Sequence, residues 1–199
     1  MRKQCIVTIA REYGSGGHVV GQKIAEQLGI KYYDRNLLEE ICSELGLEDR
    51  EYTFFDENSS GHIYKGNAGD HKKIMEDQVA GYQFDYMRKL AEEGESFVIV
   101  GRCAEWILRD FIGKTSVFIT GEDRTKRKRI MNEYGYTDQE AKAAIRQADK
   151  NRSAYHDRYS EVKWGDARGY DLCINSSFIG LDACAKLVIQ YIKAKEEEE

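Results

Sequence analysis

The sequence predicts an α/β protein built around a mostly parallel β-sheet. Short apolar segments rich in β-branched residues alternate along the chain with longer segments of helical periodicity, which is the βαβ order of a parallel sheet. Several of the short segments are apolar almost throughout, as expected of strands that helices cover on both faces. The chain has 199 residues, of which 41% are apolar and 33% charged, so we expect a single well-packed domain over residues 1–199.

Four or five segments are predicted as strands, with IKYYD the shorter candidate, and seven as helices. The strands are QCIVTIA, IKYYD, SFVIVG, TSVFITG and YDLCINS, at residues 4–10, 30–34, 96–101, 115–121 and 170–176. Helical patterns lie near residues 18–28, 36–45, 74–93, 103–110, 123–134, 138–159 and 180–195. Because the chain has no proline, the expected helix boundaries rest on Gly, Asn, Asp and Ser.

Residues 46–73 break this alternation. The segment is polar, contains glycines and aromatic residues, and shows no clear period, so it is either an excursion from the fold or an arm that contacts a partner. Its aromatic side chains could bury themselves against a second subunit in a homodimer, or equally against the chain's own surface. They are Tyr52, Phe54, Phe55 and Tyr64.

The charge distribution favours a small phosphorylated ligand over nucleic acid. Residues 101–168 carry 15 Lys and Arg against 11 Asp and Glu, whereas the whole chain has a net charge of -5. The basic residues are interleaved with acidic ones and the pI is about 5.5, which argues against a nucleic-acid partner. The positive region is therefore a candidate anion-binding surface.

We expect a cytoplasmic protein that is not bound to a membrane. No charged segment followed by an apolar one opens the chain, and no apolar stretch approaches the roughly 20 residues that span a bilayer. The five cysteines are widely spaced and mostly lie in apolar segments, which indicates small core residues in a reducing compartment rather than disulfides or a zinc site.

The segment REYGSGGHVVG, residues 11–21, carries four of the chain's 18 glycines between the first predicted strand and the first predicted helix. Glycines let the backbone approach a ligand, and a helix N-terminus offers unpaired amides, so this order favours phosphate binding over a simple turn. The P-loop pattern GxxxxGK[ST] also needs a lysine and a hydroxyl, whose places are held here by Gly17 or His18 and by Val19. Arg11 and His18 could supply the missing positive charge.

Two further strand ends carry charged residues. In YYDR, Asp34 is suited to cap the following helix, and Arg35 is either a phosphate ligand or an ordinary surface arginine. Gly101 and Arg102 end the strand FVIVG, and Arg102 would share a crevice with the glycine loop if the two strands are adjacent.

Two predicted helices carry arginines that belong either to a solvated helix face or to a lid over a phosphate site. In RTKRKRI, Arg124, Arg127 and Lys128 share one side, and Arg152 stands near Tyr155 and His156 in DKNRSAYHDRY. Such runs are usually solvated faces, but two helices of this kind over a phosphate site would form a lid that neutralises a transferring phosphoryl group.

Taken in order, these pieces resemble the cytidylate kinase-like family, which is related to the nucleoside monophosphate kinases. The resemblance spans nearly the whole chain and is most specific in REYGSGG with GQKIAEQLG, YYDR, VGRCAEWIL, and DKNRSAYHDRY to WGDARGYDLCINSS. It implies a three-layer P-loop kinase fold with five parallel strands in the order 2-3-1-4-5, helices on both faces, an acceptor-side arm at residues 46–73 and a helical lid at residues 137–165.

The resemblance also implies a phosphotransferase that moves the γ-phosphoryl group of ATP, with Mg²⁺, to a nucleoside monophosphate such as CMP or dCMP. The donor-side residues would be Arg11, Gly14, Ser15, Gly16, Gly17, His18 and Arg124. Asp34, Arg35 and Arg102 would hold the acceptor, Arg102, Arg127 and Arg152 would act on the transferring group, and no metal ligand can be assigned.

The chain departs from the family pattern at the lysine and hydroxyl of the glycine loop, and at Cys103, where an acid is usual. Each departure removes a group that stabilises transferring charge or positions magnesium. Two alternatives therefore stand beside the kinase hypothesis: a weak or inactive nucleotide-binding protein on the same scaffold, and a kinase for a different small acceptor.

Overall fold

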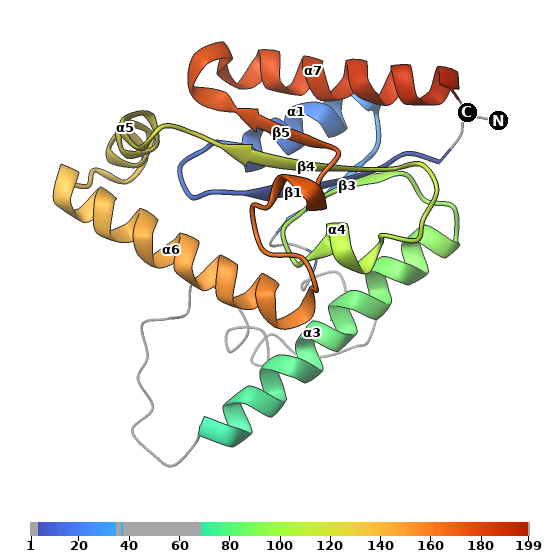
Figure 1. Ribbon diagram of the computed structural model, residues 1–199, viewed down its shortest axis with the longest axis horizontal. Coiled ribbons are helices and arrows are strands. Elements are labelled where there is room, and N and C mark those ends of the chain that lie inside the picture. Colours follow the sequence, from blue (N-terminus) through green and yellow to red (C-terminus); the bar gives the residue numbers. More distant parts are fainter. Residues whose placement is uncertain (1–3, 35–36, 38–68, 199) are drawn as a thin grey trace.

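The computed structural model describes residues 4–34, 37 and 69–198, and it centres on a five-stranded parallel sheet (Figure 1). The strand order is β2-β3-β1-β4-β5, as predicted. All five predicted strands are present, with ends that differ from the expected ones by a few residues. They are β1 (Ile6–Arg11), β2 (Lys31–Tyr33), β3 (Phe97–Val100), β4 (Lys114–Thr120) and β5 (Leu172–Asn175).

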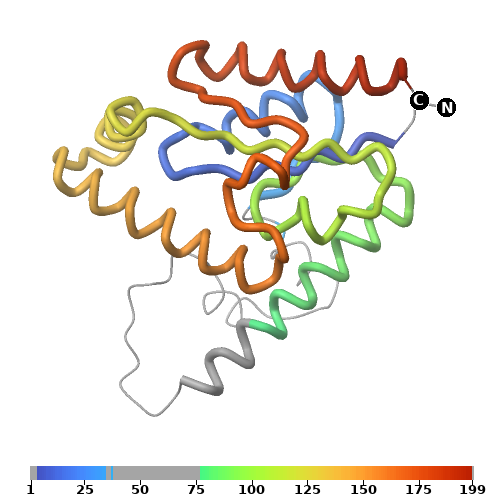
Figure 2. The backbone as a smooth tube through the Cα atoms, in the orientation of Figure 1, coloured from blue at the N-terminus to red at the C-terminus, as the bar shows by residue number. Residues whose placement is uncertain are grey.

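Helices cover both faces of the sheet and complete three layers. Figure 1 shows α7 above the sheet with α1 beside it, and α3 and α4 below. In Figure 2 the chain leaves the sheet after β4, forms α5 and α6 at one end, and returns to β5. The helices are α1 (Gly17–Leu28), α3 (Gly69–Glu92), α4 (Ala104–Ile107), α5 (Asp123–Tyr134), α6 (Asp138–Tyr159) and α7 (Ser176–Glu198), with a short 3₁₀ helix, η2 (Ala167–Gly169).

The central strands are buried on both sides, which explains why their sequences are mostly apolar. In β1, Ile6 packs in the core under α3 and α4, whereas Val7 and Ile9 pack in the core under α1 and α7. In β3, Phe97 and Val98 divide between the same two cores. Successive side chains of a strand point to opposite faces, so a strand with helices on both faces has no polar side.

Helices α5 and α6 lie beyond the carboxyl end of β4, and both occupy the predicted ranges. Gly135, with a φ of 70°, ends α5, and Thr137 begins α6 with a capping box that it shares with Glu140. At the other end of α6, Arg158 and Tyr159 bind the carboxylate of Asp77 in α3.

Some predictions lie outside the described residues. These include Arg35, the predicted helix at 36–45 except Leu37, and segment 46–73 up to residue 68. The predicted helix at 103–110 is helical only over Ala104–Ile107, followed by turns. Among the cysteines, Cys103 and Cys184 are buried as expected, but Cys173 is exposed. Of the helices that the structure describes, none has the length and apolar character required to span a membrane.

Candidate phosphate-binding site

The sheet register brings three predicted site segments to one edge. β3 lies between β1 and β2, with Ile9 opposite Val100 and Tyr33 opposite Ile99. The Gly101 N–H donates to the Ile9 carbonyl at 2.8 Å, so the GR turn starts beside the glycine loop. The adjacency required for Arg102 to share the crevice is therefore met, and the ligand site of an open parallel sheet is expected here.

The glycine loop takes a conformation that requires its glycines. Gly14 and Gly16 have φ values of 77° and 81°, in the left-handed region. Gly16 precedes α1, whose first helical bond runs from the Val20 N–H to the Gly16 carbonyl at 3.0 Å. No side chain of the described residues caps this end. The first-turn amides of α1, including those of Gly17 and His18, are thus available for an anion.

Arg129 and Ser176 hold the loop from behind. The Nη1 of Arg129 donates to the carbonyls of Gly14 and Ser15 at 3.1 and 2.7 Å and to Ser176 Oγ at 3.0 Å. Ser176 Oγ donates to the Ser15 carbonyl at 2.6 Å. These bonds engage the Gly14 and Ser15 carbonyls and fix the conformation of the loop at the start of α1.

A second, charged cluster fixes the segment before the glycines. The ammonium of Lys126, a side chain only 5% exposed, lies 2.9 Å from Glu12 Oε2 and 3.8 Å from Asp149 Oδ2. Glu12 also accepts from Thr120 Oγ1 at 2.7 Å, and Asp149 accepts from the Tyr13 N–H at 2.6 Å. Burial raises the pKa of Asp149, although the Tyr13 amide and Lys126 oppose that rise. The cluster joins the loop to α5 and α6.

A cleft of about 650 Å³ opens in front of the loop. Its walls come from the glycine loop, the start of α1, the end of β2, α5, α6 and the start of α7. They include Arg11, Gly14, Gly16, Gly17, His18, Asp34, Arg129, Tyr134, Arg152 and Leu181. This volume lies in the range of small-molecule sites, which is roughly 300–1,000 Å³.

Besides Arg129, the arginines Arg11 and Arg152 supply charge at the cleft. The side chain of Arg11 is 13% exposed, and its Nη2 lies 3.7 Å from Asp34 Oδ1. Arg152 on α6 donates from Nη1 to the Arg11 carbonyl at 3.1 Å, and its guanidinium lies 5.4 Å from the centre of the Tyr13 ring. Both arginines also line a second, small cavity of about 20 Å³ beside the GR turn.

The GR turn has an unusual backbone. Gly101, Arg102 and Cys103 have φ values of 83°, 59° and 56°, so three successive residues are left-handed, two of them with side chains. Such conformations cost about 1–3 kcal/mol each and concentrate at functional sites. The turn directs Arg102, a residue only 8% exposed, into the wall of the small cavity.

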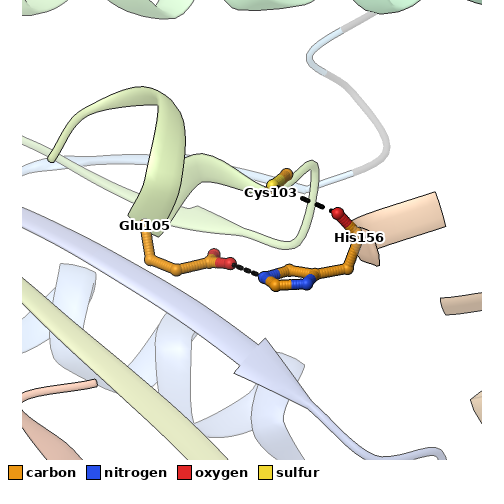
Figure 3. A group of neighbouring side chains, drawn as sticks. All are labelled: Cys103, Glu105 and His156. Carbon is orange, nitrogen blue, oxygen red and sulfur yellow. Dashed lines mark hydrogen bonds and ion pairs between the residues drawn. The ribbon is translucent and has the colours of Figure 1, made fainter. Parts of the chain in front are cut away.

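Behind this turn, Cys103, Glu105 and His156 bring their potential metal-ligand atoms within 4.8 Å of one another (Figure 3). Glu105 Oε1 lies 2.6 Å from His156 Nε2. Burial lowers the pKa of His156, but hydrogen bonding and charge attraction to Glu105, with a contribution from Asp157, outweigh it and raise the pKa overall. Burial also raises the pKa of the Cys103 thiol, which disfavours the thiolate that a metal needs. We interpret this group as a buried ion pair that fastens α6 to the GR turn.

The structure brings most of the predicted donor-side residues together, but not all of them. Ser15 is fully buried, and its hydroxyl donates to the Glu12 carbonyl at 2.8 Å instead of facing the cleft. Arg124 is exposed on α5 and does not line the cleft. Arg127 pairs with Asp138 at 2.7 Å and lines a separate cavity between α5 and α6. The roles of all the predicted site residues stay predictions, including those of these three residues and of Arg35.

Sequence reasoning missed the residues that hold the loop in place. Lys126 and Arg129 stand in the basic run, and Glu12 stands inside the loop motif itself. Ile130 is the one apolar residue of RTKRKRI and is 2% exposed, so it marks the buried face of α5. Lys126 lies four residues before Ile130, on that same face. This spacing was the signal that could have found it.

Taken together, the sheet order, the glycine loop at the start of α1 and the arginine-lined cleft define a protein of the P-loop kinase fold class. The model of the cytidylate kinase-like family matches residues 6–178, and the chain belongs to that family.

Three known proteins are similar to this chain over nearly its whole length. The chain is 26% identical over 196 residues to a protein named cytidylate kinase from Thermoplasma volcanium, across 97% of this chain and 94% of the relative. The crystal structure of an uncharacterized protein from Eubacterium ventriosum is similar with a TM-score of 0.77 and 38% identity, across 96% and 99% of the two chains. A shikimate kinase from Bacteroides thetaiotaomicron has a TM-score of 0.56 at 13% identity, across 95% and 98%, and shares the fold.

Proposed function

We propose that this protein is a phosphotransferase that moves the γ-phosphoryl group of ATP to a nucleoside monophosphate, with CMP or dCMP as the acceptor. One observation carries the proposal: the α1 amides and the Arg11 and Arg152 side chains converge on one cleft at the carboxyl edge of the sheet. Family membership and the relative named cytidylate kinase support the choice of reaction and acceptor.

The proposed chemistry is positioning and charge neutralisation. The amides of Gly14, Gly16, Gly17 and His18 hold the donor phosphates, as helix N-termini hold anions. Asp34 and Arg102 stand at the ends of β2 and β3, where the acceptor would bind next to the donor. Arg152 reaches the cleft from α6 and would neutralise charge that spreads over the transferring group, so that α6 acts as part of a lid over residues 137–165.

A magnesium ion would accompany ATP. Asp34 supplies a cleft carboxylate of the kind that Mg²⁺ accepts, whereas Glu12 is already engaged by Lys126 and Thr120. Among the described residues Glu133 also lines the cleft, and the ion would take its remaining ligands from phosphates and water. When bound, it would neutralise phosphate charge.

The test is transfer of radiolabel from [γ-³²P]ATP in saturating Mg²⁺. The acceptor panel is CMP, dCMP, UMP, AMP, shikimate and gluconate, the last two because relatives of this fold are named for kinases of such compounds. We expect labelled CDP or dCDP. The Arg102→Met variant, purified identically, guards against contaminating kinases and should raise the KM for the acceptor more than that for ATP. Absence of transfer to every acceptor would refute the kinase proposal.

A second candidate function rests on Gly17, which stands at the place of the P-loop lysine. Without that lysine, the scaffold could bind nucleotide and release it unchanged. Calorimetric binding of ATP or CMP, combined with no turnover against the full panel, would favour this binding function.

A further inference from the structure

The Arg11 side chain fills space that two glycines leave open. A Cβ atom placed on Gly17 would lie 2.5 Å from Arg11 Cβ and 3.0 Å from its Cγ. A Cβ atom placed on Gly101 would lie 2.2 Å from Arg11 Nη1. Real Cβ atoms do not approach so closely, so any larger residue at position 17 or 101 would displace the arginine.

Arg11 and Gly17 both occupy defined places in the P-loop pattern. When the second glycine of GxxxxGK[ST] is set at Gly16, which precedes α1, the first glycine of the pattern falls on Arg11 and its lysine falls on Gly17. The cation and the glycine have exchanged places. The missing lysine and the extra arginine are therefore two parts of one structural change.

The guanidinium is placed to meet a phosphate. The Arg11 stem packs against Gly17 of the glycine loop, and its terminal nitrogens lie beside Gly101 of the GR turn and Asp34, so the side chain runs from the loop along the wall of the cleft toward the ends of β3 and β2. Its 3.7 Å distance to Asp34 exceeds the roughly 2.7–2.9 Å of a charge-assisted hydrogen bond, so it can turn toward a phosphate without breaking a short bond. The bond from Arg152 to the Arg11 carbonyl fixes the backbone from which the side chain extends.

We propose that Arg11 replaces the P-loop lysine as the cation that binds the β- and γ-phosphates of the nucleoside triphosphate, and that Gly17 and Gly101 are the residues that admit it. This inference rests on the proposed function for the identity of the ligand. It differs from that function in naming the phosphate-binding side chain and the reason that Gly17 cannot be lysine while Arg11 is present.

The experiment is an exchange of the two residues. Calorimetry measures the affinity of the full chain for ATP and for inorganic tripolyphosphate, and the label assay measures turnover. We expect Arg11→Gln, which keeps the packed stem without the charge, to weaken ATP binding about 10- to 100-fold, because charge-assisted hydrogen bonds contribute roughly 1.5–3 kcal/mol. Gly17→Lys alone should also weaken binding, because its Cβ collides with Arg11. The double variant Arg11→Gly/Gly17→Lys should bind at least tenfold more tightly than Arg11→Gly.

A control and a folding check complete the design. Arg88→Ala removes one exposed positive charge on α3 and should leave ATP affinity unchanged within twofold. Circular dichroism establishes that each variant is folded, and Arg11→Gln remains informative if Arg11→Gly does not fold.

The outcomes separate this inference from the proposed function. If ATP binding depends on Arg11 but no turnover is seen, the phosphotransferase proposal is refuted and the phosphate-binding role of Arg11 is supported. Turnover and binding that survive Arg11→Gln would support the kinase and overturn the inference. Tighter binding in Gly17→Lys with Arg11 present, or binding that appears only once Arg11 is removed, would also overturn it. Absence of any binding to the wild-type protein would overturn both.

Discussion

Removal of the Lys126 ammonium should destabilise the protein by about 3 kcal/mol. Breaking a buried ion pair by deleting one partner costs roughly 3–5 kcal/mol, because the other charge stays buried. Of the carboxylates left behind, Glu12 and Asp149 are 24% and 19% exposed and keep donors from Thr120 and Tyr13. The third, Asp123, lies 3.4 Å from the ammonium and is 84% exposed, so the cost lies at the lower end. Lys126→Met preserves the stem volume, so a cavity adds little.

The same change should make stability depend more strongly on pH. Burial already raises the pKa of Asp149, and loss of Lys126 removes an opposing attraction, so this pKa rises further in the variant. An acid with a raised folded pKa destabilises the protein while it is ionised, and the penalty fades as pH falls toward its unfolded value. The deficit of Lys126→Met should therefore shrink as the pH is lowered from 7 to 5.

Urea unfolding followed by circular dichroism at several pH values measures both effects. Lys142→Met is the matched control, since Lys142 is exposed on α6 beside the same inter-helix cavity, and it should change stability by no more than about 0.5 kcal/mol. Two results would refute the claim that the Lys126 ammonium stabilises the buried carboxylates of this cluster. One is a loss of unfolding free energy below about 1 kcal/mol for Lys126→Met, and the other is a loss that stays constant between pH 5 and 7.

Two further predictions concern the glycine loop and the buried pair behind the GR turn. Gly14→Ala should cost at least about 1 kcal/mol more in urea unfolding than Gly29→Ala: both residues have a left-handed φ, but only at Gly14 would a Cβ meet a backbone carbonyl, at 2.9 Å. Equal losses would contradict the packing of the loop against α5. Because the pKa of His156 is raised, its pairing with Glu105 stabilises the protein fully below the ordinary histidine value near 6.5 and is lost as pH rises through the folded pKa. Unfolding free energy should fall between pH 6 and 9 in the wild type and not in Glu105→Gln/His156→Gln; parallel profiles would count against this pair.

The sheet could be predicted well because its strands carry an unambiguous signal. Strands buried on both faces are short and apolar, and the residues after them gather at one edge whatever the details of packing. This is why the sequence indicates that Arg102 lies near the glycine loop if β1 and β3 are adjacent, a condition that the strand order meets. The ranges of α5 and α6 could be predicted because Gly135 and Thr137 punctuate them clearly.

The orientation of side chains could not be predicted in the same way. In RTKRKRI, the spacing to Ile130 marks Lys126 among five basic residues, but only the rotation of α5 against the loop decides that Arg129 reaches the loop carbonyls while Arg127 meets Asp138. Ser15 shows the same limit, because a hydroxyl in a glycine loop can turn either to a ligand or to the chain itself. In the structure the Ser15 hydroxyl donates to the Glu12 carbonyl, so it turns to the chain itself.

The loop is ordered by contacts that do not involve a ligand, and this affects how binding would be driven. Arg129 and Ser176 fix its carbonyls, and the Lys126 cluster fixes its entry, so the chain's own contacts hold the loop at the start of α1. A ligand would then not need to order the loop, and binding to a preorganised site loses less free energy to such ordering. What the loop lacks is the cation of the P-loop pattern. The affinity of this cleft for polyphosphate should therefore depend on charge more than on loop ordering, and Arg11 is the cleft side chain whose position accounts for that charge.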